Sequence, residues 1–127
     1  MTLHSFPIRV YPADTDHGGI VHHAQYWRYC EQARVAWFEE RYGPIEQMTE
    51  AHQLFFVVRR AQADYFKPAH LYDKLIIESV AHLARPAVLT FQQRALLASN
   101  QDILFEGHLD LVCVDQSLKP KPVPWKD

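Results

Sequence analysis

Two aspartates and two adjacent glycines stand close together in the segment Asp14-Thr15-Asp16-His17-Gly18-Gly19. A helical pattern begins shortly after it, near Ala24, and the first turn of a helix exposes unpaired backbone N–H groups and a partial positive charge. Such N–H groups can stabilise a carbonyl oxygen as it becomes an oxyanion, while a nearby carboxylate acts as base or nucleophile. The alternative is that the aspartates only cap the helix and the glycines only turn the chain. Spacing alone leaves both interpretations open.

The motifs of several other enzyme classes are missing from the sequence. With only four glycines, the chain cannot form a GxGxxG, Walker A or GxSxG arrangement. It also has no CxxC or HExxH pair, and its densest histidine cluster, His17 with His22 and His23, has no recognised ligand spacing. We therefore predict no metal site and no cofactor.

One long helix and several strands must position the chemistry-bearing segment. The helix is predicted from Ala24 to Tyr42, where apolar residues recur at helical spacing until Gly43 and Pro44 end it. Cys30 lies on the apolar stripe, so we expect a packed core cysteine rather than a reactive thiol. Apolar or alternating runs predict strands at 6–10, 54–65, 75–83, 87–98 and 103–114, with another helical turn at 45–52.

Short loops join most of these strands, and strands joined by short loops pair as antiparallel neighbours. The expected architecture is α+β, with one long helix on one face of a mainly antiparallel sheet. A single helix leaves the other face and the sheet edges uncovered. We therefore expect self-association.

Composition limits the functional class. A chain of 127 residues and 14.8 kDa predicts a single domain, residues 1–127. A formal charge of −2 and a pI near 6.4 argue against a nucleic-acid-binding protein. Two cysteines, no signal-peptide pattern and no long apolar run predict a cytoplasmic protein without membrane insertion.

The same segment resembles the acyl-CoA thioesterases of the hotdog fold, specifically the 4-hydroxybenzoyl-CoA thioesterase family and its Tol-Pal-associated bacterial subgroup. The similarity runs through residues 9–11, 14–21 and 23–26, then Glu31-Gln32-Ala33-Arg34 in the helix. The segment 64–69 with Asp73 resembles the family's DYxxPAxxxD pattern, and residues 114–124 also fit. The resemblance implies a hotdog fold, in which an antiparallel sheet of about five strands wraps around one long central helix.

The resemblance also assigns roles to single residues. It implies that Asp16 is the catalytic carboxylate, with Asp14 as the rival, and that the backbone N–H of His23 polarises the thioester carbonyl. Gly19 or its neighbour Gly18 would allow close backbone approach. In the family the active site lies at a subunit interface, and dimers commonly pair into tetramers.

Substrate contacts are expected from a further set of residues. His22, Gln25 and Tyr26 would lie near the acyl group, although His22 and Gln25 stand where the family often has an aromatic residue and asparagine. His17 is expected to be an exposed loop residue. The phosphates of CoA require cations, for which the candidates are Arg59, Arg60, Lys67 and Arg85. Arg85 is preferred because it stands in an expected strand-to-strand loop.

The resemblance therefore predicts hydrolysis of an acyl-CoA to a carboxylic acid and free CoA, without a cofactor. Two other functions remain open: hydrolysis of acyl groups carried on acyl carrier protein, and binding of acyl-CoA without catalysis. A dehydratase of the same fold is less favoured, because its His and acidic residue have only His23 and Glu31 as counterparts here, about two helical turns apart.

Overall fold

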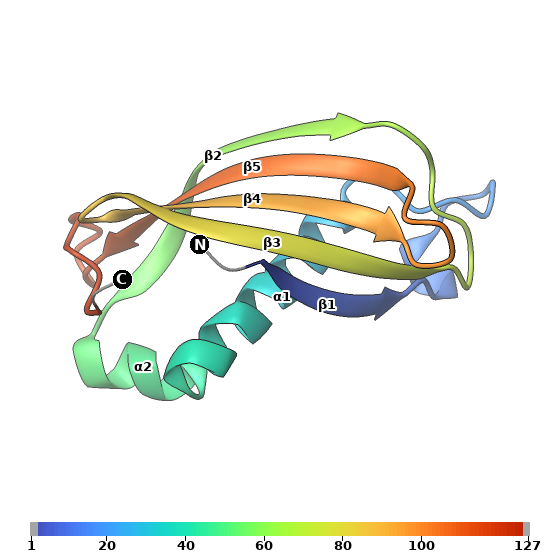
Figure 1. Cartoon of the computed structure of the whole chain (residues 1–127). Helices are drawn as coiled ribbons and strands as arrows, with labels where there is room; N and C mark the ends of the chain where they lie inside the picture. The colour runs from blue at the N-terminus through green and yellow to red at the C-terminus, as the bar shows by residue number, and fades with distance from the viewer. Residues whose placement is uncertain (1–2, 126–127) are drawn as a thin grey trace.

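The computed structural model describes residues 3–125 and shows one long helix, α1 (Gln25–Tyr42), lying along one face of a five-stranded antiparallel sheet (Figure 1). The strands are β1 (His4–Arg9), β2 (Phe55–Tyr65), β3 (Lys74–Arg85), β4 (Val88–Leu97) and β5 (Ile103–Val114). The expected helical turn at 45–52 is a full second helix, α2 (Ile45–His52). The predicted α+β class and the sheet of about five strands are confirmed.

The sheet order is β1-β3-β4-β5-β2, which corrects one predicted pairing. β3, β4 and β5 are consecutive antiparallel neighbours as expected, but β2 pairs with β5 and β3 pairs with β1. The connection 66–73 between β2 and β3 therefore crosses the end of the sheet instead of making a hairpin. Phe66 and Lys67 donate their N–H groups to the carbonyl of Leu104 at 2.9 and 3.3 Å as the crossing begins.

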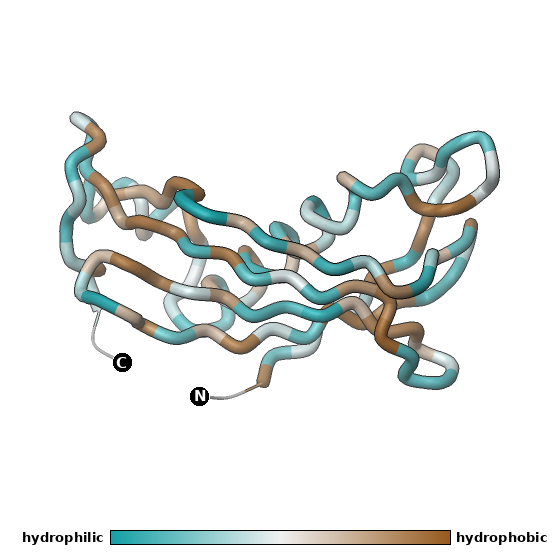
Figure 2. The backbone as a smooth tube through the Cα atoms, turned by 90° about the horizontal axis from the view of Figure 1, so that it is seen from above, coloured by the Kyte–Doolittle hydropathy of each residue, from teal (hydrophilic) through white to brown (hydrophobic). Residues whose placement is uncertain are grey.

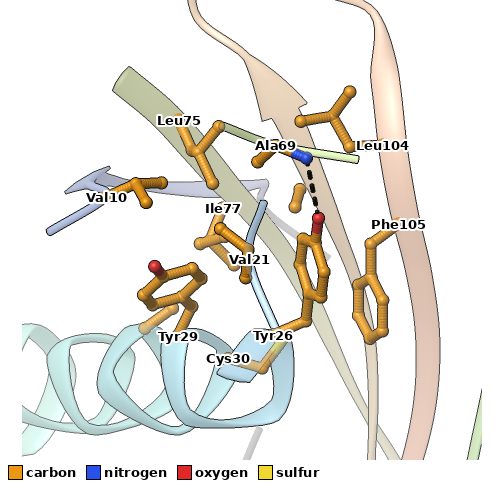
Figure 3. Packing of buried hydrophobic residues seen from close by; sticks show 12 residues of the cluster. Val10, Val21, Tyr26, Tyr29, Cys30, Ala69, Leu75, Ile77, Leu104 and Phe105 are labelled. Carbon is orange, nitrogen blue, oxygen red and sulfur yellow. Dashed lines mark hydrogen bonds between the residues drawn. The ribbon is translucent and has the colours of Figure 1, made fainter. Parts of the chain in front are cut away.

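The helix has the boundaries and the buried stripe that its sequence pattern predicts. Gly43 takes φ +83° and donates its N–H to the Glu39 carbonyl at 3.0 Å, which ends α1. Apolar side chains from α1 pack against the sheet in two clusters. The first contains Tyr26, Tyr29, Cys30 and Ala33 with residues of β3 and β5 (Figure 3), and the second contains Trp37 and Phe38 with residues of β3, β4 and β5.

Hydrophobic and hydrophilic residues alternate along the strands, as Figure 2 shows. This alternation places one face of each strand on α1 and the other outward. Cys30 is fully buried, and burial raises the pKa of its thiol to about 12, so the expectation of a core cysteine is confirmed. Between residues 3 and 125, neither helix has the length and apolarity that crossing a bilayer requires.

A polar network inside this core fixes the helix relative to the sheet. Gln93, on the apolar face of β4, accepts a hydrogen bond from Arg34 Nη1 at 3.1 Å. Its amide nitrogen donates to the Cys30 carbonyl at 3.0 Å and to Ser79 Oγ at 2.9 Å. All four residues are buried, and burial lowers the pKa of Arg34. One glutamine side chain thus connects α1 with both central strands.

Candidate active site

Two loops meet at the end of the sheet where α1 begins. They are residues 10–24, between β1 and α1, and residues 66–73, between β2 and β3. Four backbone hydrogen bonds of 2.9–3.0 Å join the two loops. They link Val10 with Asp73, Val10 with Tyr72, Gly19 with Leu71, and Val21 with Ala69. The connection 66–73 therefore stabilises the loop that contains Asp14, Asp16 and the two glycines.

Asp16 organises the first loop and keeps part of its carboxylate available. Its Oδ1 accepts the N–H of Gly18 at 2.9 Å, and its own N–H donates to the Ile20 carbonyl at 2.9 Å. The side chain is exposed, and its Oδ2 makes no hydrogen bond with any part of the chain that the structure describes. Gly19 takes φ +74°, a backbone conformation that other residues adopt at a cost. The glycine is required for the loop's path.

Asp14 is engaged in the structure instead. Its Oδ2 accepts hydrogen bonds from the Tyr11 backbone N–H at 3.0 Å and from the Tyr29 hydroxyl at 2.9 Å. Burial of Tyr29 and this bond to Asp14 raise the pKa of the phenol well above its usual range. The two aspartates thus have different surroundings: Asp14 ties the loop to α1, and Asp16 faces solvent.

The start of α1 has no side-chain cap. The N-cap residue is Ala24, so the interpretation in which the aspartates cap the helix is wrong. His22 holds the preceding turn: its N–H donates to the Asp14 carbonyl at 3.0 Å, its carbonyl accepts from Gln25 N at 2.8 Å, and its Nδ1 accepts from Ala24 N at 3.2 Å. The N–H of His23 has no hydrogen-bond partner among residues 3–125. It is the donor that sequence analysis singled out.

A pocket of about 320 Å³ opens beside His23. Its lining comes from both loops and from the first turn of α1, namely Ile20, Val21, His23, Tyr26, Tyr65, Phe66, Lys67 and Pro68. Tyr26 is a buried wall residue whose hydroxyl accepts the Ala69 N–H at 3.0 Å (Figure 3) and whose ring stacks on Phe105 at 5.1 Å. The pocket is mostly apolar, with the Lys67 ammonium paired to Asp102 at 3.1 Å.

Sequence reasoning did not assign Tyr65, Phe66 or Pro68 to the site, and it considered Lys67 only as one of several candidate cations for CoA. The available signal was the DYxxPA pattern at 64–69, which contains them, but their place depends on the crossing connection. Gln25 is the first residue of α1 and does not line the pocket. His22 is exposed beside it, with its ring 4.4 Å from that of His23. His17 is also exposed, as expected.

Arg85 is the predicted contact that the structure does not bring to the site. It is the last residue of β3 rather than a loop residue, and the site lies at the opposite, Lys74 end of the strand (Figure 1). Twelve residues of extended chain span about 40 Å at ~3.3 Å each. Within one chain, Arg85 cannot reach a ligand at His23.

His17, His22 and His23 are not gathered into a candidate ligand set among residues 3–125. Across residues 3–125, no three His, Cys, Asp or Glu side chains gather closely enough to hold an ion. An activated carbonyl compound needs no metal at a site that offers a carboxylate and a free N–H donor. The arrangement is therefore suited to acyl transfer.

Comparison with known proteins agrees with that class. Residues 10–127 match the thioesterase-like superfamily, and the chain belongs to this superfamily. It is 38% identical over 124 residues to the acyl-CoA thioester hydrolase YbgC of Escherichia coli O6:H1, covering 97% of this chain and 91% of that protein. It is also 38% identical over 121 residues to the acyl-CoA thioesterase YbgC of Haemophilus influenzae, covering 95% and 87%.

Solved structures support the hotdog fold. A 1,4-dihydroxy-2-naphthoyl-CoA thioesterase from Synechocystis superposes with a TM-score of 0.90 at 22% identity, covering 97% of this chain and 90% of that one. A gentisyl-coenzyme A thioesterase, BH1999, gives a TM-score of 0.85 at 19% identity, covering 94% and 95%. At these identities the likeness is one of fold. The predicted hotdog architecture is confirmed.

Proposed function

We propose that this protein is a thioester hydrolase that converts an acyl-CoA to a carboxylic acid and free CoA. The observation that carries the proposal is the unpaired N–H of His23, at an uncapped helix start, on the same loop as the exposed carboxylate of Asp16. The relatives named as acyl-CoA thioesterases support it.

The reaction uses these two groups in complementary ways. The thioester oxygen accepts the His23 N–H, which stabilises negative charge as the carbonyl carbon becomes tetrahedral. Asp16 either takes a proton from the attacking water or attacks the carbon itself. The C–S bond then breaks, and CoA leaves as the thiolate and is protonated. On the general-base route the oxygen of water is then in the carboxylic acid. On the nucleophilic route water must next hydrolyse the mixed anhydride between the acyl group and Asp16, which releases the acid and restores the carboxylate. No cofactor takes part.

The acyl group occupies the pocket beside His23, where Tyr26 and Pro68 provide apolar walls. Gly19 allows the loop to approach the substrate closely because its positive φ turns the backbone there. His22 and Gln25 border this region without lining the pocket. They affect which acyl group is accepted only indirectly, through the turn before α1 that their hydrogen bonds hold.

The test is release of free thiol from a panel of acyl-CoAs by the wild type and by Asp16→Asn. We expect the variant to lose about 100-fold or more in kcat, since an asparagine is neither base nor nucleophile. Equal turnover by both proteins would exclude this mechanism. Tight acyl-CoA binding without thiol release by the wild type would indicate a binding module instead.

Two further arms refine the assignment. The same acyl group supplied on CoA and on acyl carrier protein shows which carrier is preferred. Single turnover in heavy-oxygen water separates the two roles of Asp16. A nucleophilic Asp16 whose anhydride is opened by water at the aspartyl carbon takes up the label itself and releases an unlabelled acid, whereas a general base sends the label directly into the product.

We also propose that the enzyme is a homodimer, able to pair into a tetramer, whose subunits meet at the β2 edge. β2 is an 11-residue edge strand with exposed Val58. Beside it lies a groove of about 270 Å³ lined by Trp27, Val58, Ala61 and Leu109, with the charged residues Arg28, Glu31 and Arg34 of α1. Uncovered edges of this length invite pairing with another strand. Both cysteines are free and buried, which fits a reducing cytoplasm.

A further inference from the structure

The hydroxyl of Tyr65 reaches the turn that carries the His23 N–H. It donates a hydrogen bond to the His23 carbonyl at 3.1 Å, across 42 residues of sequence. Tyr65 is the last residue of β2, so this bond joins the sheet's edge strand to the start of α1. It is a contact between two elements that the sheet itself does not connect.

The ring of Tyr65 is held by three aromatic neighbours. Its centroid lies 5.2 Å from Phe105, 5.8 Å from Tyr26 and 6.3 Å from His23. Even so, 47% of the residue remains exposed, and it also lines the pocket beside His23. Tyr65 is therefore not a core residue. Its hydroxyl is held in a fixed position, where it binds the turn before α1.

The bond from Tyr65 holds one peptide group next to the one that carries the free N–H. The carbonyl that Tyr65 holds belongs to the His23–Ala24 peptide, whose N–H donates to His22 Nδ1 at 3.2 Å. Holding this peptide at both ends fixes ψ of His23. The neighbouring His22–His23 peptide, which carries the free N–H, is fixed by the bond from Gln25 N to the His22 carbonyl at 2.8 Å. The direction of the free N–H is therefore set from both sides.

We propose that Tyr65 is a positioning residue that aims the His23 N–H at the thioester oxygen. The inference rests on the proposed function for its catalytic consequence, but not for its structural one. A preorganised donor contributes to the transition state because it needs no rearrangement when charge develops. Without the hydroxyl, the turn would sample other orientations and the donor would lose part of its effect.

The experiment compares Tyr65→Phe with Tyr72→Phe. The first change removes the hydroxyl and keeps the ring contacts. The second removes the hydroxyl of a tyrosine of similar exposure, 53% against 47%, which makes no hydrogen bond in the described chain. We expect Tyr65→Phe to lower kcat by about 10–100-fold, with KM within about threefold and an unchanged Tm. Tyr72→Phe should match the wild type.

A second readout does not depend on activity. In ¹H–¹⁵N spectra, the Ala24 amide should exchange with solvent about tenfold faster in Tyr65→Phe than in Tyr72→Phe, because the peptide is no longer held. Equal kcat in the two variants, or a change in KM alone, would overturn the proposal. If the wild type hydrolyses no acyl-CoA, the proposed function fails, and Ala24 exchange alone then decides: faster exchange supports the positioning role and unchanged exchange refutes it.

Discussion

Asp14 and Asp16 are two residues apart, yet their surroundings give them separate tasks. Asp14 accepts two hydrogen bonds, from the Tyr11 N–H and the Tyr29 hydroxyl, whereas Asp16 accepts one from Gly18 and is exposed. A carboxylate committed to hydrogen bonds within the chain, one of them from the buried Tyr29, contributes to stability, and one facing solvent is available to a substrate. The physical difference lies in which donors surround each side chain.

This difference predicts opposite effects of truncation at the two positions. Asp14→Ala should lower the free energy of unfolding by about 1–3 kcal/mol, because the Tyr29 hydroxyl loses its acceptor inside the structure. Asp16→Ala should lower it by less than about 1 kcal/mol, since it removes an exposed bond. Urea denaturation of both variants provides the measurement. A larger loss for Asp16→Ala than for Asp14→Ala would contradict the assignment.

At the residue scale, the sequence suggests roles only where a motif stands on one continuous segment. The choice of Asp16 and His23 needed only residues 14–26 and the resemblance they carry. Tyr65 could not be assigned, because its bond to His23 depends on how β2 ends relative to α1. The distance of Arg85 from His23 within one chain could not be foreseen either, because an expected loop position carries no information about which end of the sheet it occupies.

Among the elements, α1 and β4 are held together by more than apolar contact. Gln93 joins Arg34, the Cys30 carbonyl and Ser79 in one buried network. The cation of Arg34 is buried, so its hydrogen bond to Gln93 compensates part of its lost hydration. Helix and sheet are consequently fixed in one register, which also fixes where the first turn of α1 lies.

Replacing this glutamine should therefore be costly. We expect Gln93→Leu to lower the free energy of unfolding by about 2–4 kcal/mol, because a buried guanidinium and a buried carbonyl lose their partners. Gln92→Leu, on the neighbouring exposed position of the same strand, should change it by less than about 0.5 kcal/mol. Similar losses in the two variants, measured in urea, would show that the network adds little.

The elements themselves were largely predictable, but one pairing was not. Helical spacing ending at Gly43 predicted α1, and alternation predicted the strands. The short connection after β2 suggested a hairpin to β3. Its path across the sheet end depends on long-range bonds, such as that from Phe66 to Leu104, which no local pattern encodes.

For the whole molecule, the β2 edge and the groove beside it form an uncovered surface. If a second subunit covers it, a charge introduced there should separate the subunits. We expect Val58→Asp to shift the protein from dimer to monomer in light scattering coupled to size-exclusion chromatography, because an unpaired carboxylate is costly in an interface. Leu118→Asp, at a more exposed position in a turn, is the matched control.

The two results decide between clear alternatives. A dimer that persists in Val58→Asp at the wild-type concentration would exclude β2 as the contact. Loss of thiol release together with the dimer would support a site completed by the partner subunit, whereas an active monomer would show that one chain suffices.

The crossing between β2 and β3 also has a consequence for the order of folding. β3, β4 and β5 are successive hairpins that close short loops, whereas the site requires residues 10–24 to meet residues 66–73 across the intervening helices and β2. Closing long loops costs more chain entropy, so we expect these contacts to form late. A partly refolded chain would then already have a sheet, but no working site. Activity would appear only when residues 10–24 have met residues 66–73.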